Sequence, residues 1–513
     1  MTGQNIPKTW TMVALDDLGE WRGGGTPSKS NESFWDGHIP WVSPKDMKVS
    51  RIRDTLDHIT ELAIEKSATK LVPENSILMV TRSGILAHTF PVAKTDVQVT
   101  LNQDLKALTT EDGIDPDYIA WAFRALQREI LGTCSKSGTT VHSIEMPFFM
   151  AFQVPVAPTN EQHHIVAKIE ELFSELDKGI ESLKTAREQL KVYRQTVLKH
   201  AFEGKLTAHW REQNKDKPET AAQRLARSKK EREARYQKQL KEWKTAVKTW
   251  EVEGKPGKKP SKPKAPSAPV LVDDKDLPNL PAGWCWLKIS SLGDIETGNT
   301  PPKKNPAFYG GGIPFFKPTD LEAGHNVVAA NEYLSKLGFS EARPLPENSI
   351  LVTCIGATIG KTGIIRRRGT SNQQINSIIP ETVFDPDFIY FQVIGPLFQK
   401  EIKNNYSSTT LPILNKSKFS ELLFAACSSE EQRLIAEHLR QQMSSIDKLD
   451  EEIEFELSKS EALRQSILKK AFSGQLVAQD PSDEPASALL ERIKAEKADQ
   501  EKSNKKNKRR NAA

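Results

Sequence analysis

The chain has 513 residues, enough for several domains, and its 37% hydrophobic and 27% charged fractions are typical of a soluble protein with charged helices. The net charge of +5 is small for this length, so any basic surface must be local. No apolar run is long enough to cross a bilayer, and the N-terminus has no secretory apolar region, so we expect a cytoplasmic protein without a membrane span. The four cysteines (Cys134, Cys285, Cys354 and Cys427) have no paired spacing, which excludes a zinc finger and argues against structural disulfides.

Two parts of the chain, residues 1–158 and 279–427, repeat one another. Their framework motifs recur in the same order, interrupted only by a few loop deletions. The sequence therefore predicts two homologous domains. The matched segments are Asn5–Met47 with Asn279–Leu321, Pro73–Leu78 with Pro346–Leu351, Asn102–Gln103 with Asn372–Gln373, and Asp115–Ile119 with Asp385–Ile389.

Each of these domains combines short β-rich runs with a few helix starts. Asp115-Pro116 and Asp385-Pro386 predict helix N-termini, because aspartate caps a helix and proline is tolerated at its first position. The β-rich runs lie between Pro/Gly turns, which predicts a strand-rich α+β body. These runs are Ser76–Thr81, Ser349–Cys354 and Gly363–Ile365.

The loops differ between the two copies, although the framework is shared. Lys48–Thr69 has little in common with Glu322–Ala342, and Arg82–Val99 has little in common with Ile355–Gly369. Divergent loops on a duplicated scaffold are expected when each half must recognise something different.

Basic side chains in these loops suit nucleic-acid recognition, because Arg and Lys contact guanine and phosphates. Each taken alone is more simply a surface charge, and the cluster Arg366–Arg368 is the most suggestive. Asn102 and Gln103 could contact adenine but are also explained as structural, since both copies contain them. The candidates are Lys45, Lys48, Arg51, Arg53, Arg82 and Lys136 in the first half, and Lys317, Lys361, Arg366, Arg367, Arg368 and Lys403 in the second.

Each domain is followed by a long amphipathic segment, residues 159–206 and 428–476. Apolar residues every seven positions form a seam that must be buried against another helix, and two matched helices most simply bury their seams on each other. Capping boxes are predicted at Thr159/Gln162 and Ser429/Gln432, and left-handed helix ends at the glycines 204 and 474. A helix of this span is about 69 Å long, roughly two turns of duplex DNA. The seam residues are Ile169, Leu176, Leu183, Leu190 and Val197, with Leu439, Ile446, Ile453 and Ile467.

Two further segments are rich in charge. Residues 207–278 contain a charged helical stretch, Ala221–Trp250, followed by a Lys/Pro-rich run that is too polar to bury a core and predicts an extended, flexible linker. Residues 477–513 form a basic C-terminal tail, and its run Lys494–Arg510 is better explained as a solvated charge run than as a DNA-binding arm.

No catalytic or metal-binding constellation emerges from the sequence. Gly356–Thr362 resembles a phosphate-binding loop but has one residue too few between its glycines, so a turn between strands explains it better. Asn305–Phe308 and Asp385–Phe388 lack the second proline of an amino-methyltransferase signature, and no glycine-rich loop for S-adenosylmethionine follows a strand. The ten histidines show neither metal-ligand nor triad spacing.

The two copies of these motifs resemble the specificity subunit of type I restriction-modification systems. The resemblance rests on a Gly/Asn-Thr-Pro turn, an Ile-Pro-aromatic motif, Pro-Glu-Asn-Ser-Ile-Leu and the helix motif Glu-Gln…Lys-x-Ala-Phe-x-Gly, each present twice and in order. It covers nearly the whole chain except the central Lys/Pro-rich insert, in which this chain departs from the usual pattern, and the C-terminal tail.

The resemblance implies an α+β fold with two target-recognition domains separated by two long helices packed as an antiparallel coiled coil. Each domain would recognise one part of a split, asymmetric double-stranded DNA target, and the helices would fix the gap. The subunit would have no active site or cofactor of its own. It would bind two methyltransferase subunits and be joined by restriction (motor-nuclease) subunits, and these partners would hold S-adenosylmethionine, ATP and Mg²⁺.

Two other functions remain as alternatives from the residues themselves. One is a self-contained DNA methyltransferase, which would bind S-adenosylmethionine without partners. The other is a scaffold protein that joins other proteins and does not bind DNA, which would show no sequence-dependent binding to a DNA library.

Overall fold

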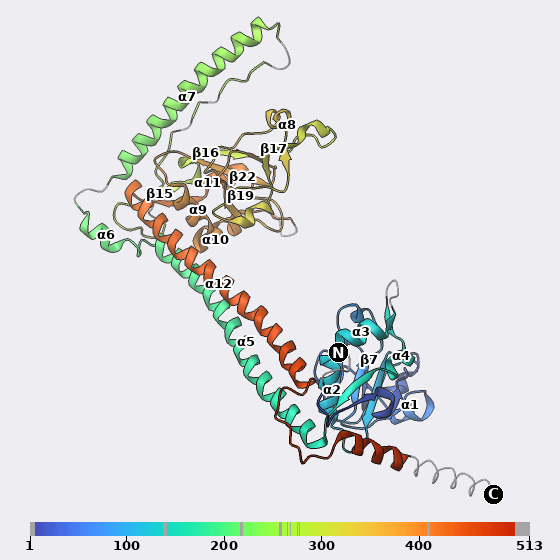
Figure 1. Cartoon of the computed structure of the whole chain (residues 1–513). Coiled ribbons are helices and arrows are strands. Elements are labelled where there is room, and N and C mark those ends of the chain that lie inside the picture. Colours follow the sequence, from blue (N-terminus) through green and yellow to red (C-terminus); the bar gives the residue numbers. More distant parts are fainter. Residues whose placement is uncertain are drawn as a thin grey trace, which may run out of the picture. The chain divides into compact units, whose positions relative to one another are not determined.

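The computed structural model describes residues 6–136, 141–215, 219–255, 259–263, 265–266, 268–273, 275, 277–407 and 411–497 (Figure 1). The chain divides into two compact units. The first comprises Met1–Lys184 with Ile453–Ala513, and the second comprises Thr185–Glu452. Each unit therefore contains one strand-rich domain together with one end of each long helix, α5 (Thr159–Phe202) and α12 (Ser429–Ala471).

The domain of the first unit is built on mixed, mainly antiparallel sheets. Its strands are β1 (Thr11–Ala14), β2 (Gly19–Gly23), β3 (Trp35–Val42), β4 (Arg51–Ile52), β5 (Asp57–Ile59), β6 (Leu71–Val72), β7 (Ile77–Val80), β8 (Arg82–Ser83), β9 (Val92–Thr95), β10 (Val99–Leu101), β11 (Leu105–Thr110), β12 (Ser135–Lys136), β13 (His142–Ile144) and β14 (Gln153–Val156). Its helices are α1 (Glu61–Lys66), α2 (Pro116–Ala125), α3 (Gln127–Cys134) and α4 (Met146–Met150). The main sheet has the order β2-β11-β7-β9-β4, and a smaller sheet has the order β5-β3-β10-β6.

The domain of the second unit repeats this plan. Its strands are β15 (Cys285–Lys288), β16 (Gly293–Thr297), β17 (Tyr309–Phe316), β18 (Tyr333–Leu334), β19 (Ile350–Thr353), β20 (Thr362–Ile364), β21 (Thr370–Ser371), β22 (Ile375–Pro380) and β23 (Leu423–Ala426). Its helices are α6 (Ala208–Gln213), α7 (Ala221–Val252), α8 (Lys336–Ser340), α9 (Pro386–Ile394), α10 (Pro396–Asn405) and α11 (Lys416–Glu421). The sheet β16-β22-β19-β20 matches β2-β11-β7-β9, and β18-β17-β21 matches β5-β3-β10.

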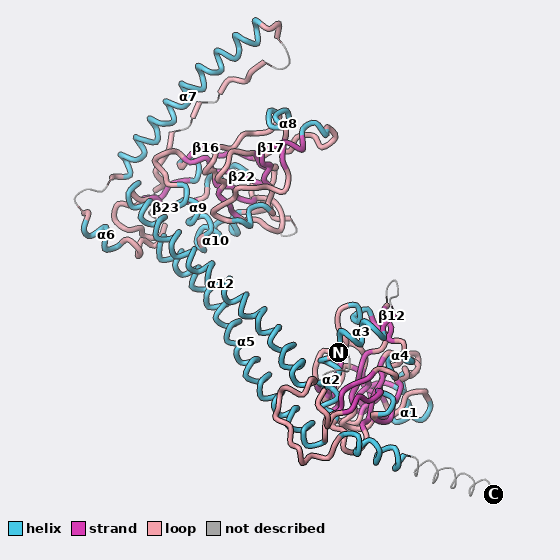
Figure 2. The backbone as a smooth tube through the Cα atoms, in the orientation of Figure 1, coloured by secondary structure: helices cyan, strands magenta, loops and turns pink. Residues whose placement is uncertain are grey.

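The predicted local elements of both domains are present (Figure 2). The β-rich runs form β7, β19 and β20, and the stretch Gly356–Thr362 is the connection between the antiparallel strands β19 and β20. Asp115 caps α2 by accepting from the backbone N–H of Asp117 at 2.7 Å, and Asp385 caps α9 in the same way at 2.9 Å. The strand-rich α+β class predicted from the sequence is confirmed.

The two long helices run antiparallel within each unit. In the first unit the start of α5 and the end of α12 both contact the domain: the Thr159 hydroxyl donates to the Gly113 carbonyl, and the Phe472 ring lies 5.1 Å from that of Tyr118. In the second unit Phe202, at the end of α5, lies 5.4 Å from Phe388, and Glu431, at the start of α12, accepts from Trp284. In each unit one helix starts beside the domain on which the other helix ends. The two helices are therefore antiparallel, as expected from the family resemblance.

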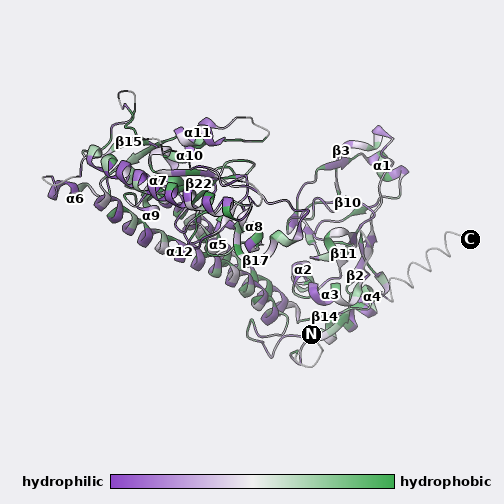
Figure 3. Ribbon diagram, turned by 90° about the horizontal axis from the view of Figure 1, so that it is seen from above, coloured by the Kyte–Doolittle hydropathy of each residue, from purple (hydrophilic) through white to green (hydrophobic). Residues whose placement is uncertain are grey.

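The seam residues of both helices are turned away from solvent. Ile169 and Ile467 belong to the core of the first unit, and Leu439 and Ile446 to that of the second. Leu176, Leu183, Leu190, Val197 and Ile453 are half-buried, and none of the nine is exposed. Hydrophilic residues cover much of the remaining helix surface (Figure 3).

Two of the ion pairs across the helices obey the internal repeat. Arg464 pairs with Asp177 in the first unit, and Arg194 pairs with Asp447 in the second. Arg464 and Asp447 are the repeat mates of Arg194 and Asp177, so one contact is made twice with the helices exchanged. Four residues that the repeat retains thus fix the same antiparallel register in both units.

A Glu-Gln pair at the start of each helix joins it to its domain. Glu161 accepts a hydrogen bond from the Trp10 indole at 2.9 Å, and Glu431 accepts one from the Trp284 indole at 3.0 Å. Gln162 accepts from the backbone N–H of Asp115 at 2.8 Å, and its mate Gln432 repeats this contact with Asp385 at 2.9 Å.

The predicted capping boxes are wrong for this reason. The side-chain oxygens of Gln162 and Gln432 accept from backbone N–H groups of the domain, so they do not accept from the N–H groups at their own helix starts. Thr159 and Ser429 likewise donate to the carbonyls of Gly113 and Val383. A capping box does form at the start of α7, between Thr220 and Gln223.

Both predicted left-handed helix ends are confirmed. Gly204 and Gly474 have φ angles of 69° and 72°. At the end of α5 the N–H of Lys205 bonds to the His200 carbonyl at 3.0 Å, and that of Gly204 to the Ala201 carbonyl at 3.1 Å, which is a Schellman motif. A side chain at either glycine would also collide with a proline of the adjoining domain, Pro281 or Pro7.

The two charged segments have more structure than composition predicts. The stretch Ala221–Trp250 lies within α7, as predicted, and the described part of the Lys/Pro-rich run is extended but lies against that helix, with Pro260 accepting from the Trp243 indole at 2.9 Å. Residues 486–497 are helical, and Leu489 and Ile493 are buried in the core of the first unit. Most of the run Lys494–Arg510 lies outside the described residues.

We predict that the two glutamates at the helix starts contribute unequally to stability. Glu431 also accepts from Thr207 at 2.6 Å and pairs with Arg211 at 2.5 Å, whereas burial raises the pKa of Glu161, whose second oxygen has no hydrogen-bond partner within the described chain. Glu431→Gln should therefore lower the free energy of unfolding by about 2 kcal/mol, because Arg211 loses a buried counter-charge. The matched change Glu161→Gln should cost less than about 1 kcal/mol, because the amide oxygen still accepts from Trp10. Thermal unfolding and hydrogen exchange at each helix start measure both effects, and equal losses would contradict the prediction.

Candidate DNA interface

In both domains a pair of parallel strands ends at the same polar corner. β3 and β10 pair in parallel through Leu101 and Val42, and the Asn102 N–H then bonds to the Val42 carbonyl at 2.9 Å. In the second domain β17 and β21 pair in parallel, and Asn372 bonds to Phe316 at 3.1 Å. Because parallel strands end on the same side of a sheet, the loops that follow them start next to each other.

The Asn-Gln residues at this corner have a structural role, which is one of the two interpretations that the sequence allows. Asn102 accepts from the Asp104 N–H at 2.9 Å and so closes the turn. Gln103 bonds to the Thr26 hydroxyl, and its mate Gln373 accepts from Thr300 at 2.6 Å. The Gly/Asn-Thr-Pro turn is therefore fastened to the corner in both halves, although Gln103 and Gln373 remain exposed.

A repeated aspartate braces the loop that leaves the corner. Asp46 accepts from the N–H groups of Ser43 at 2.9 Å and Leu56 at 3.1 Å. Asp320 accepts from Lys317 at 2.7 Å and Asn331 at 2.9 Å. The framework thus holds the base of each loop in place, while the residues between these anchor points differ.

Four of the predicted contact residues are exposed lysines without an ion pair in the described chain. Lys45 and Lys48 lie in the braced loop of the first domain. Lys136 ends β12, next to residues 137–140, which lie outside the described chain, and Lys403 lies on α10. These lysines have no ion pair with a described residue to break before they contact a phosphate.

Arg51 and Arg366 are instead held by carboxylates. Arg51 lies 3.2 Å from Asp96, 3.1 Å from Asp117 and 3.4 Å from Glu170. Arg366 pairs with Asp387, the repeat mate of Asp117, and donates to the Asn348 side chain at 2.8 Å. Both guanidinium groups bind the start of the helix that follows β11 or β22, so their first role is structural.

The remaining candidates form ion pairs, a hydrogen bond or a cation–π contact at or near the surface. Arg53 donates to Asp96 at 2.9 Å, and this hydrogen bond lowers the pKa of Asp96. Exposed pairs of this kind are weak, so their cations can exchange a carboxylate for a phosphate. The others are Arg82 with Asp104 at 2.6 Å, Lys317 with Glu332, Lys361 with Glu322 at 2.7 Å, Arg367 with the Gly312 carbonyl at 2.9 Å, and Arg368 over the Phe339 ring at 5.1 Å.

The sequence analysis missed basic residues of the shared framework. Lys29 and its repeat mate Lys303 are exposed in the Thr-Pro turn that is bonded to the corner, and Lys304 follows. Both copies have a lysine at this position, so it lies outside the divergent loops in which contact residues are expected. The repeat itself was the signal that could have found them.

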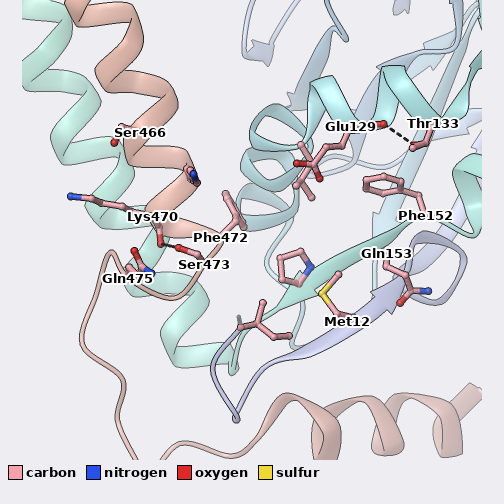
Figure 4. Close-up of a pocket in the computed structure, with 14 residues that line it drawn as sticks. Met12, Glu129, Thr133, Phe152, Gln153, Ser466, Lys470, Phe472, Ser473 and Gln475 are labelled. Carbon is pink, nitrogen blue, oxygen red and sulfur yellow. Dashed lines mark hydrogen bonds between the residues drawn. The ribbon is translucent and has the colours of Figure 1, made fainter. Parts of the chain in front are cut away.

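A groove lies beside the end of α12 in the first unit. It has a volume of about 950 Å³, with one wall from Ser466, Lys469 and Phe472 and the other from α3 and the strands β1 and β14 (Figure 4). A smaller groove of about 370 Å³ lies at the end of α5 in the second unit. Its Thr196, Lys199 and Pro396 are the repeat mates of Ser466, Lys469 and Leu126. Its other lining residues, Lys191, Val192 and Gln195, are the mates of Glu461, Ala462 and Gln465, which line another groove of about 300 Å³ in the first unit. The duplication thus places grooves at corresponding positions on the two helices.

The described residues contain no group of three or more His, Cys, Asp or Glu side chains placed to hold a metal ion. Within the same residues, no helix has the length and apolarity that spanning a membrane requires.

Comparison with known proteins gives the family. The model for the type I restriction modification DNA specificity domain matches residues 7–187 and 281–458. The specificity subunit of the type I restriction enzyme EcoR124I/EcoR124II from Escherichia coli is 40% identical over 185 residues, which is 35% of this chain but only 46% of that relative. The EcoDI specificity subunit, also from Escherichia coli, is 24% identical over 75% of this chain and 77% of its own length.

A solved structure supports the fold. A chain from a structure concerned with complex assembly and conformational transition of a type I restriction-modification system covers 92% of this chain and 99% of its own length, with 15% identity and a TM-score of 0.63. The family model matches well over half of the sequence, once in each domain. The chain therefore belongs to the family of type I restriction-modification DNA specificity subunits.

Proposed function

We propose that each domain recognises one part of a bipartite, asymmetric DNA target and that α5 and α12 set the gap between the parts. The observation that carries this proposal is the repeated polar corner: the same hydrogen bonds hold it in both domains, but the loops that leave it differ in sequence. A constant framework with variable loops suits two readers of unlike half-sites. A stiff helical spacer makes their contacts act as one bidentate site, because effective concentration raises affinity only at the matching separation.

The chain acts without catalysis of its own and directs methylation and cleavage by partner subunits. The duplicated grooves support binding of two copies of one partner, for which two methyltransferase subunits are the fitting candidates. Restriction subunits then complete the complex. We assign S-adenosylmethionine, ATP and Mg²⁺ to these partners, as the family resemblance implies.

Exposed apolar residues beside the grooves favour this docking. Tyr193 is 50% exposed near the groove on α5, and its repeat mate Leu463 is 49% exposed near the groove on α12. Leu449 is exposed to the same extent, 48%, but its repeat mate is Gly179. An exposed apolar side chain that recurs at both sites is better explained by a repeated partner than by chance.

Substitutions should distinguish lysines that contact DNA from arginines that stabilise the fold. Lys45→Gln with Lys48→Gln should weaken binding of target DNA about tenfold or more at low salt without changing the melting temperature, because each lysine is exposed and without an ion pair. Arg51→Gln should lower the melting temperature, because Asp96, Asp117 and Glu170 lose a shared counter-charge. Fluorescence anisotropy and thermal unfolding distinguish the two, and a stable double lysine variant with unchanged affinity would refute the assignment.

The spacing of the target should follow the length of the helices. Inserting one heptad into both helices, after Thr185 and after Phe455, lengthens the pair by about 10 Å, or roughly three base pairs. Mapping methylated adenines in cells that carry the system should show a gap wider by about this amount with both half-sequences unchanged. A heptad in one helix alone should abolish methylation, because it breaks the register set by Arg194 and Asp447. An unaltered gap in the double insertion would disprove the spacer role.

Partner stoichiometry should depend on the two recurring apolar residues. Tyr193→Glu or Leu463→Glu should each remove one methyltransferase copy from the co-purified complex, and the double variant should remove both, because a charge replaces an apolar contact. Leu449→Glu is the matched control and should leave the complex intact. Native mass spectrometry measures the copy number. If all three single variants retain two copies, the grooves are not the docking sites.

A further inference from the structure

The described residues of the central insert form an arm, which we define as the described part of residues 221–269. Its helix α7 carries a stripe of large side chains with heptad spacing, Tyr236, Leu240, Trp243, Val247 and Trp250, and every one of them is half-buried. The flanking residues of the same turns are mostly exposed. Because this stretch of α7 extends beyond the domain body (Figure 1), something other than the domain core must cover the stripe.

The returning Lys/Pro-rich segment provides that cover. Its prolines at positions 260, 263, 266 and 269 recur every third residue, and all four are half-buried, while the described residues between them are exposed. A polyproline II helix has three residues per turn, so a proline at every third position lines one face. The Trp243 indole donates to the Pro260 carbonyl at 2.9 Å, and the Lys259 ammonium lies 6.0 Å from the Trp250 ring. The prolines therefore pack on the aromatic stripe.

A buried polar network fastens the base of the arm to the second domain. Ser228 and Arg232, both on α7, bind the two oxygens of Glu381, a carboxylate that is 1% exposed. One turn away, Glu231 accepts from the Thr382 N–H at 3.0 Å. Both ends of the arm are held, because the N–H of Val272 bonds to the Trp286 carbonyl at 3.2 Å. The arm is thus a fixed part of this unit.

The arm concentrates positive charge on a chain that has little. Residues 221–269 contain fifteen Lys and Arg against five Glu, a net charge of +10, whereas the whole chain carries +5. The rest of the chain is therefore negative overall. Six lysines of α7 are exposed and have no ion pair with any described residue: Lys229, Lys230, Lys238, Lys241, Lys244 and Lys248.

Four of these lysines share one side of the helix. At 3.6 residues per turn, Lys230, Lys241, Lys244 and Lys248 fall within about 60° of one another, and the centre of this row lies about 110° around the helix from the centre of the stripe that the prolines cover. From the first to the last they span about 27 Å, most of one turn of duplex DNA. The packing of α7 on the proline segment thus leaves a rigid row of cations facing solvent.

We propose that this lysine row binds the phosphate backbone of duplex DNA outside the recognised target, a proposal that rests on the DNA-recognition function proposed above. Lysines act as point charges toward phosphates without the paired geometry that arginine offers to a base. Single-stranded DNA is a poorer fit, since it is bound by stacking on exposed aromatic rings, and the arm covers its rings with prolines. The binding is independent of sequence and adds affinity to both target and non-target DNA.

The test uses the full-length chain and a random-sequence duplex about four helical turns long. Replacing the four lysines by glutamine (Lys230→Gln, Lys241→Gln, Lys244→Gln and Lys248→Gln) should raise Kd at least about tenfold at 0.1 M salt and reduce the slope of log K against log salt by about 3, because up to four phosphate contacts are lost. Replacing the same four by arginine should preserve both quantities. The ratio of target to random-duplex affinity should stay unchanged in every variant.

The outcomes separate this inference from the function on which it rests. A glutamine variant with wild-type Kd and salt slope, and with α7 intact by circular dichroism, would overturn the arm as a DNA contact and point to an acidic protein partner. A wild-type chain that cannot distinguish its methylated target sequence from random duplex would instead count against the proposed recognition function. A glutamine variant that loses discrimination along with affinity would show that the arm belongs to target recognition and would also overturn the proposal.

Discussion

The constraint on which the architecture depends is the junction between each domain and the helix that follows it. A buried carboxylate accepts the indole N–H of a tryptophan from the first strand region of the domain, Trp10 to Glu161 and Trp284 to Glu431. The side chain of the adjacent glutamine accepts a hydrogen bond from the backbone N–H of the aspartate that caps a helix of the domain. Because unpaired buried polar groups are costly, these bonds fix the direction in which the helix leaves the domain. A helix held only by its apolar seam could rotate or slide; one anchored at its first turn cannot.

Because of the internal duplication, one set of contacts is made twice, once in each unit. Each helix begins on one domain and ends in the other unit, so its Arg and Asp meet the Asp and Arg of its mate, Arg194 with Asp447 and Arg464 with Asp177. Residues of the repeat that make none of the shared framework contacts are free to diverge. That explains why the loops leaving the polar corner differ while the Thr26–Gln103 and Thr300–Gln373 contacts persist.

Much of this architecture could be predicted from the sequence because it is local or periodic. The heptads predicted two long helices with buried seams, and the family resemblance implied that they run antiparallel. Asp115 and Asp385 predicted helix caps, and Gly204 and Gly474 predicted helix ends whose φ angles only glycine adopts readily. The capping boxes failed because Gln162 and Gln432 bind backbone groups that lie far away in sequence. Arg51 and Arg366 could not be told from Lys45 for the same reason: their carboxylate partners come together only in the fold.

The arm shows how a segment of low hydrophobicity can become ordered. Its period-three prolines and period-seven aromatics were both visible in the sequence, but each pattern alone predicts only an extended linker or a charged helix. The two patterns stabilise one another, because a proline-rich extended segment has little conformational freedom to lose and the aromatic stripe needs a narrow apolar ridge to cover it. The lysines are then forced outward, because neither surface has room for a charge. The row of lysines available for phosphate binding is thus a consequence of the apolar packing between α7 and the prolines.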